Sequence, residues 1–283
     1  MALQPRNLAV VVACLAGTYA TLLLSRPVIK ALAKEGGWFE SAGALALLVA
    51  GVLFFAAFLR SRKPVNRDAF PLVKRMFLLG MAVLFVFGAG EEISWGQRVF
   101  GVETPAGLAA VNVQGETNLH NLAWVPDEDF ALFMICWGLV VIALPLVAAV
   151  SGPVRRRADR LVPIVPLVLG SLFVVNYVMS KAAGMVVPYL NSHLSLSRLT
   201  DGRVEIQESN FSILAALIAL HIYRFMLQPG AVKQAAAPAP RLVSVVPDPE
   251  AQREDRAFAY ADDWAMMTGS ADPRAVASGK RRT

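Results

Sequence analysis

Six long apolar segments constrain this chain more than any other feature. They cover residues 8–24, 39–59, 76–94, 130–150, 161–180 and 211–228. Each approaches the roughly 20 residues that a helix needs to cross a hydrocarbon core about 30 Å thick. Their apolar runs are continuous, whereas the strands of a membrane barrel alternate in polarity. The sequence therefore predicts an all-α, polytopic transmembrane helical bundle of about six spans.

The composition agrees with this prediction. Hydrophobic residues make up 56% of the 283 residues and charged residues only 17%. The mean hydropathy is +0.51, which lies well above the range of ordinary soluble domains. We therefore assign residues 1–228 to the transmembrane domain.

Residues 229–283 differ in character from the rest of the chain. They begin with an alanine- and proline-rich stretch, 235–240, and continue with nearly balanced charges. Such a composition is typical of an extended linker followed by a disordered tail. The sequence predicts a flexible cytoplasmic tail here. In an alternative interpretation, residues 251–267 form a short helix that docks on a cytoplasmic protein partner.

Basic residues in two linkers indicate the orientation of the spans. The linker after the second span and the linker after the fourth carry ten basic residues: Arg60, Arg62, Lys63, Arg67, Lys74, Arg75, Arg155, Arg156, Arg157 and Arg160. Short loops rich in lysine and arginine stay cytoplasmic. Both termini are then cytoplasmic and segment 91–130 is extracytoplasmic, although the basic loop 25–37 argues the other way. The net charge of +6 lies mainly in these linkers, so we expect no nucleic-acid partner.

Two adjacent carboxylates, Glu91 and Glu92, stand at the end of the third apolar segment. Glu91 follows Met76 by 15 residues, which corresponds to roughly 22 Å along a helix. The pair is therefore expected a turn or two below the outer headgroups, a costly place that usually marks a site. A continuous helix would place Ser94, Trp95 and Arg98 on the face of Glu91. The pair is either a ligand or acid/base site, or a structural ion pair with Arg98.

A second polar cluster follows in residues 112–121. Glu116 and His120 are four residues apart, so on a helix they would share one face and suit a divalent metal ion. Glu208 is expected in the first turn of the last helix, where it either favours the helix dipole or adds a metal ligand. The candidate catalytic residues are Glu91, Glu92, Arg98, Glu116 and His120. The candidate ligands of a divalent metal cofactor are Glu92, Glu116, His120 and Glu208.

The strings GEEISWGQR and NVQGETNLHNL carry a resemblance to a known group of proteins. Together they cover residues 90–122 and resemble a group of bacterial inner-membrane proteins with an "EEISWGQ … NLHN" signature. The resemblance implies a location in the bacterial inner membrane. It implies no particular reaction.

Three functions fit a carboxylate and histidine site at the extracytoplasmic face. The first is a metal-assisted hydrolase or transferase that acts on a membrane lipid or lipid-linked substrate. The second is an ion-coupled transporter, because paired acids near an interface bind protons or cations. The third is a non-enzymatic accessory subunit of a membrane complex.

Overall fold

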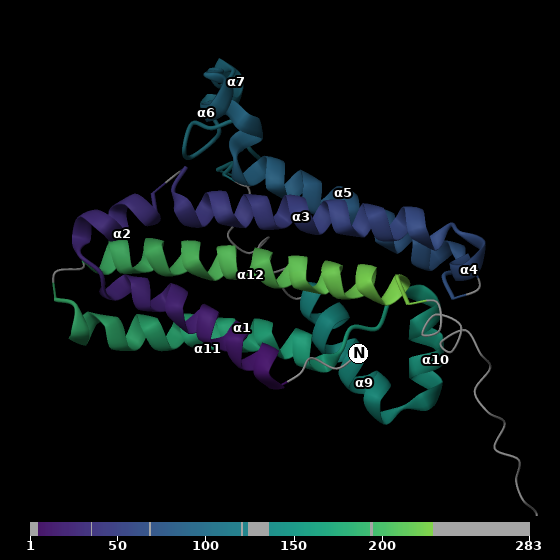
Figure 1. Cartoon of the computed structure of the whole chain (residues 1–283). Coiled ribbons are helices and arrows are strands. Elements are labelled where there is room, and N and C mark those ends of the chain that lie inside the picture. The colour runs from purple at the N-terminus through teal and green to yellow at the C-terminus, as the bar shows by residue number, and fades with distance from the viewer. Residues whose placement is uncertain are drawn as a thin grey trace, which may run out of the picture. The chain divides into compact units, whose positions relative to one another are not determined.

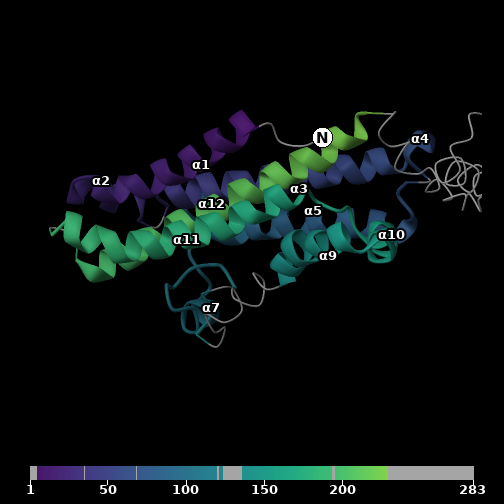
Figure 2. The same cartoon turned by 90° about the horizontal axis from the view of Figure 1, so that it is seen from below.

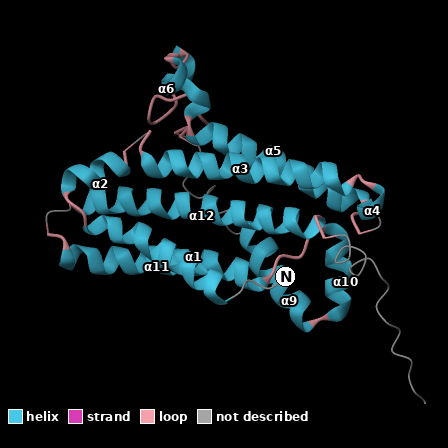
Figure 3. Cartoon of the chain, in the orientation of Figure 1, coloured by secondary structure: helices cyan, strands magenta, loops and turns pink. Residues whose placement is uncertain are grey.

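The structure is a computed structural model, and it describes residues 5–34, 36–67, 69–119, 121–123, 136–192 and 195–228. The predicted disordered tail and His120 lie outside these residues. Within them, five helices are long and apolar enough to cross a membrane. They are α1 (Pro5–Ala20, extended by the turn η1, Thr21–Leu23), α3 (Trp38–Ser61), α5 (Leu72–Glu92), α11 (Leu167–Leu190) and α12 (Leu196–Met226). The predicted all-α transmembrane bundle is confirmed, and Figure 3 shows helices joined by loops in the described residues.

The predicted span 130–150 is described only from Cys136. Its described part is a shorter apolar helix, Cys136–Val150, which contains the π-helical turn η3 (Leu139–Ala143) and α9 (Leu144–Val150). The backbone of α11 approaches this turn very closely. A Cβ atom added at Gly170 would lie 1.9 Å from the carbonyl oxygen of Val141. Only glycine fits at that position.

The last helix is much longer than its predicted span, 211–228. It begins at Leu196 and runs for 31 residues. Residues 198–210 are rich in charged and amide side chains, and hydropathy therefore indicates a loop there. These residue types do not break a helix, however, and packing decides the outcome. Gly202, for example, lies close enough to Leu22 that an added Cβ would meet its side chain at 3.2 Å.

Aromatic rings form the centre of the bundle. Phe54 of α3 stacks on Phe85 of α5 with 5.6 Å between ring centroids, and Phe85 meets Trp137 edge-on at 5.5 Å. The series continues through Phe173 of α11 to Phe211 of α12, which stack at 5.6 Å. Such pairs add to the burial energy of large side chains. They join four of the membrane helices and the helix Cys136–Val150.

The short helices lie around the ends of the bundle. α4 (Pro64–Arg67) and α10 (Gly152–Leu161) lie at one end, and α2 (Arg26–Leu32) lies at the other (Figures 1 and 2). The two basic linkers that were expected on one side of the membrane therefore do lie at one end of the bundle. Beyond α5, α6 (Gln97–Phe100) and α7 (Ala106–Ala109) project to one side of the long helices.

Candidate functional site

The helix is broken directly after the acidic pair, at a sharp bend of the chain that we call the reversal. α5 ends at Glu92. After Ile93, the residues Ser94, Trp95 and Gly96 have φ angles of 47°, 54° and 79°. A left-handed conformation costs roughly 1–2 kcal/mol for each residue other than glycine. The prediction that Glu91 shares one continuous helix face with Ser94, Trp95 and Arg98 is therefore wrong.

Hydrogen bonds hold this reversal in place. The indole Nε1 of Trp95 donates to Oε1 of Glu91 at 2.7 Å, and the ring packs so closely on Gly90 that an added Cβ would lie 2.8 Å from it. The Ser94 hydroxyl donates to Oε2 of Glu116 at 2.6 Å. Strained backbone persists only where its surroundings over-determine it, and here two carboxylates do so.

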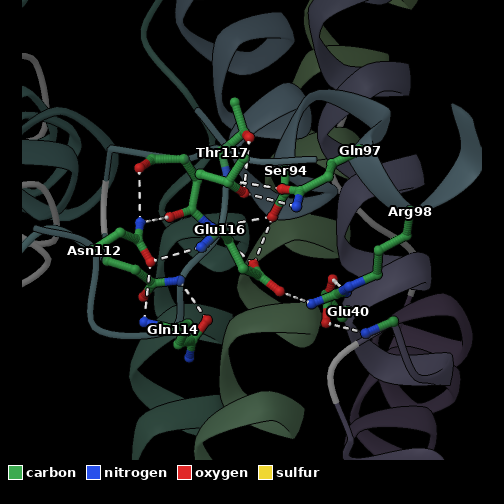
Figure 4. Close-up of polar contacts among 12 residues, drawn as sticks. Glu40, Ser94, Gln97, Arg98, Asn112, Gln114, Glu116 and Thr117 are labelled. Atoms are coloured by element: carbon green, nitrogen blue, oxygen red, sulfur yellow. Dashed lines mark hydrogen bonds and ion pairs between the residues drawn. The ribbon is translucent and has the colours of Figure 1, made fainter. Parts of the chain in front are cut away.

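Residues 93–119 and 121–123, which we call the polar cap, include the reversal and form a hydrogen-bonded unit (Figure 4). The side-chain oxygen of Asn112 accepts from the backbone N–H groups of Gln114 and Glu116, each at 3.0 Å. Its amide nitrogen donates to Oδ1 of Asn118 at 2.9 Å. These bonds satisfy the backbone without a helix. Glu116 consequently lies in an irregular segment, and the helical spacing to residue 120 does not apply to it.

Glu116 is the buried centre of the cap. Besides the Ser94 hydroxyl, it accepts a bond from the Asn118 amide at 3.0 Å and forms an ion pair with Arg98. Arg98 also donates to Oε1 of Glu40 on α3 at 2.9 Å. Partial burial acts to lower the pKa of the Arg98 guanidinium, but the charges of Glu40 and Glu116 outweigh it and raise that pKa above its usual value. Arg98 thus links the cap to the membrane helices.

Glu91 also serves the cap. Its Oε1 accepts from Trp95, and its Oε2 accepts from the backbone N–H of Leu119 at 2.6 Å. The side chain is 6% exposed. A buried carboxylate with charge-assisted bonds to two separate segments fixes both of them. The role of Glu91 in this structure is to hold the reversal and the far edge of the cap together.

Glu92 and Glu208 have different surroundings. Both are partly buried, and the charges of Glu208, Glu205 and Glu40 act on the carboxylate of Glu92. Within the described residues, neither the Glu92 nor the Glu208 carboxylate makes a hydrogen bond or an ion pair. The prediction that Glu208 lies in the first turn of its helix is wrong, because α12 begins at Leu196. The N-terminal end of the helix dipole therefore does not stabilise the Glu208 carboxylate.

The predicted metal ligands do not converge in the part of the chain that is described. There, no group of three or more histidine, cysteine, aspartate or glutamate side chains is close enough to hold a metal ion. Glu116 is engaged inside the cap, while Glu92 and Glu208 come from α5 and α12. His120 lies outside the described residues, so the complete ligand set stays a prediction.

A second buried polar cluster, missing from the candidate residues above, joins α1, α11 and α12. Asn176 and Asn210 are 0% and 1% exposed. The Tyr19 hydroxyl donates to Oδ1 of Asn176 at 2.9 Å, and Nδ2 of Asn210 donates to the same oxygen at 3.0 Å. Nδ2 of Asn210 also donates to the Thr18 hydroxyl at 2.9 Å. The sequence contains one sign of this cluster, namely Asn176 inside an apolar span, because polar side chains in such spans usually form hydrogen bonds across helices.

An apolar hollow lies on α3 and α5 beside the reversal. Its volume is about 360 Å³. Its lining consists of Phe55, Leu79, Ala82, Val83, Val86, Phe87 and Trp95. Trp95 therefore borders this hollow with its ring and donates to Glu91 of α5 with its indole nitrogen.

Comparison with known proteins adds no further constraint. No protein-family model, curated protein or solved structure matches this chain.

Proposed function

We propose that this membrane protein is a hydrolase or transferase that acts on a lipid or lipid-linked substrate at the extracytoplasmic face of the bacterial inner membrane. Glu92 and Glu208 are its working carboxylates. They bind a divalent cation or exchange protons with the substrate and water. Glu91, Glu116 and Arg98 form the framework that holds the site in place.

One observation carries this proposal, namely the unequal use of the acids. The carboxylate oxygens of Glu91 and Glu116 accept hydrogen bonds inside the protein. The carboxylates of Glu92 and Glu208 accept none within the described residues. Ionisable side chains in membrane spans are expensive and usually mark a site of function. Glu92 on α5 and Glu208 on α12 have no protein partner within the described residues, and the charge of Glu208 acts on Glu92. Such a pair is suited to hold a cation or a shared proton.

The chemistry follows from this pairing. A cation held between two carboxylates polarises a carbonyl or phosphoryl oxygen and lowers the pKa of a bound water molecule. Without a cation, repulsion between the charges of the two carboxylates would favour one protonated and one ionised group. That state provides a general acid and a general base in one place.

The apolar hollow beside Trp95 supports a lipid substrate. It is lined by apolar side chains of α3 and α5, and these helices belong to the membrane domain. An acyl chain lying in this hollow would end at the reversal, next to the acidic pair. The lipid headgroup would then stand at the level of Glu92.

Elemental analysis of the purified protein tests the proposal. The variants are Glu92→Gln and Glu208→Gln, and Glu103→Gln, an exposed carboxylate of the cap, is the matched control. We expect a stoichiometric divalent metal and turnover of phospholipid in the unaltered protein and in the control. Both should be lost in the two variants. An unaltered protein with neither bound metal nor lipid turnover would overturn the proposal.

An ion-coupled transporter is the second candidate. The polar cluster around Asn176 and Asn210 favours it, because Asn210 lies two residues after Glu208 on α12 and extends the polar region across the bundle. Proton- or cation-dependent flux in proteoliposomes, abolished by Glu92→Gln, would support this function. Flux that is identical in protein-free vesicles would exclude it.

A further inference from the structure

The other end of the bundle contains a charged surface that the proposed function does not use. α10 has four arginines and one aspartate among its ten residues. The arginines are all exposed; they are Arg155, Arg156, Arg157 and Arg160. The only acid of the helix, Asp159, accepts a bond from Lys74 of α5 at 2.9 Å. The cationic face of α10 is thus left uncompensated by its own aspartate.

α10 is fixed in position by a buried lysine. The side chain of Lys74 is 5% exposed, whereas that of Asp159 is 44% exposed. Lys74 also donates to the carbonyl oxygen of Ala69 at 3.3 Å, and its ammonium lies 4.6 Å from the ring centroid of Phe70. A partly desolvated ion pair of this kind holds α10 against the end of α5. The arginines are therefore presented on an anchored helix.

The orientation of α10 suits a membrane surface. It runs across the end of the bundle, at a steep angle to the long helices (Figure 1). Apolar side chains flank its arginines: Val150 is 83% exposed and Leu161 is 53% exposed. A short helix with cationic and apolar surfaces that lies across the spans is typical of the headgroup boundary.

A second basic segment lies at the same end. Arg62 and Lys63 precede α4, Arg67 is its last residue, and all three are exposed. α4 and α10 occupy the same end in both views (Figures 1 and 2). Two basic elements thus face the same side of the membrane domain. Their field attracts anions to this end of the protein.

We propose that α10 is a binding site for anionic phospholipids, with Arg155, Arg156, Arg157 and Arg160 as donors to the phosphodiester of the headgroup. Val150 and Leu161 contact the upper acyl chains. Guanidinium groups bind phosphate oxygens through paired N–H donors. The Lys74–Asp159 pair positions the helix and keeps the aspartate from repelling the ligand.

The test measures binding of phosphatidylglycerol and phosphatidylcholine to the full-length protein in a neutral detergent, by native mass spectrometry. The main variant is Arg155→Gln/Arg156→Gln/Arg157→Gln. The matched control, Arg26→Gln/Lys30→Gln/Lys34→Gln, removes three exposed basic charges from the opposite end. We expect phosphatidylglycerol to bind more tightly than phosphatidylcholine. The main variant should weaken it on the order of a hundredfold, and the control by less than twofold.

Two further variants separate the loss of charge from the loss of folding. The lysine variant Arg155→Lys/Arg156→Lys/Arg157→Lys should retain most of the binding. If the glutamine triple variant does not fold, the single variant Arg156→Gln should still weaken binding about fivefold. Equal losses in the main variant and the control would overturn the proposal, because they indicate unspecific attraction. Displacement of the lipid by an equal concentration of inorganic phosphate would overturn it as well, because the ligand is then a free anion.

Discussion

The two members of the acidic pair, Glu91 and Glu92, are neighbours in sequence but have different roles in the structure. Glu91 accepts bonds from Trp95 and Leu119 and connects two parts of the polar cap. Glu92 makes no such bond within the described residues, and the negative charge of Glu208 acts on it instead. Successive residues point about 100° apart on a helix. One therefore faces the cap and the other faces α12.

Glu116 and Glu208 differ in the same way as Glu91 and Glu92. Glu116 repeats the situation of Glu91, with donors from Ser94, Asn118 and Arg98, and Glu208 repeats that of Glu92. The molecule thus contains a bonded set of carboxylates and an unbonded set. The number of donors around a carboxylate, and not the motif to which it belongs, distinguishes a structural carboxylate from a candidate for chemistry. Four sets of substitutions test this distinction.

The largest effect is expected from Glu116→Gln. The replacement keeps the shape of the side chain but removes the charge that Arg98 faces, and it puts an NH₂ group where donors already point. We expect the free energy of unfolding to fall by about 2–4 kcal/mol, measured by thermal denaturation in detergent. Glu103→Gln, on the exposed side of the cap, should change stability by less than about 0.5 kcal/mol. Equal effects of the two would show that Glu116 is not the centre of the cap.

Trp95→Phe should have the next largest effect. It keeps an aromatic ring against Gly90 and Phe87, whose ring lies 5.4 Å from that of Trp95, but it removes the indole donor of Glu91. The loss of one charge-assisted bond at a half-exposed position should cost about 1–2 kcal/mol. Trp38→Phe is the control, since Trp38 is 70% exposed and makes no side-chain hydrogen bond within the described residues. Equal unfolding temperatures for the two variants would contradict the role given to the indole.

A pair of glycines isolates the backbone contribution of the cap. Gly115 has a φ angle of +68°, Gly107 lies in α7, and an added Cβ would meet nothing within 4 Å at either position. Gly115→Ala should therefore cost about 1 kcal/mol, whereas Gly107→Ala should be neutral or stabilise by up to about 1 kcal/mol. Thermal unfolding of both variants measures the difference. Similar behaviour would mean that the turn at residue 115 does not limit stability.

Hydropathy predicts the membrane helices well because the bilayer leaves few alternatives to a continuous apolar helix. It fails at residues 198–210, where polar side chains do not interrupt a helix. It also fails at the reversal, since Ser94 and Trp95 have no intrinsic preference for positive φ. Their conformation depends on Glu116 and Glu91, which are contacts that spacing alone does not show.

The shared face of Glu116 and His120 was expected only if their segment is helical. A four-residue interval is meaningful only if the backbone is helical, and Asn112 supplies that segment with competing side-chain bonds. Glu40 was not a candidate residue, because nothing in the sequence links it to Arg98. Sequence thus indicates which residues are polar and leaves open which carboxylate does which task.

The smallest effect on stability, and the sharpest test of the comparison, is expected from Glu92→Gln and Glu208→Gln. Neither carboxylate has a hydrogen-bond partner to lose within the described residues, and each substitution removes repulsion between acids. Each single variant should therefore leave the free energy of unfolding unchanged or raise it by up to about 1 kcal/mol. Thermal denaturation of the metal-free proteins, beside metal-free Glu116→Gln, measures this, because a bound cation would itself stabilise the unaltered protein.

The double variant adds the coupling between the two acids. The first substitution already relieves their repulsion, so the second should add less than its single effect. A strictly additive pair would show that Glu92 and Glu208 do not interact. A loss of stability as large as that of Glu116→Gln would move Glu92 into the bonded set. In that case both members of the pair would be structural, and the proposed chemistry would lose its carboxylates.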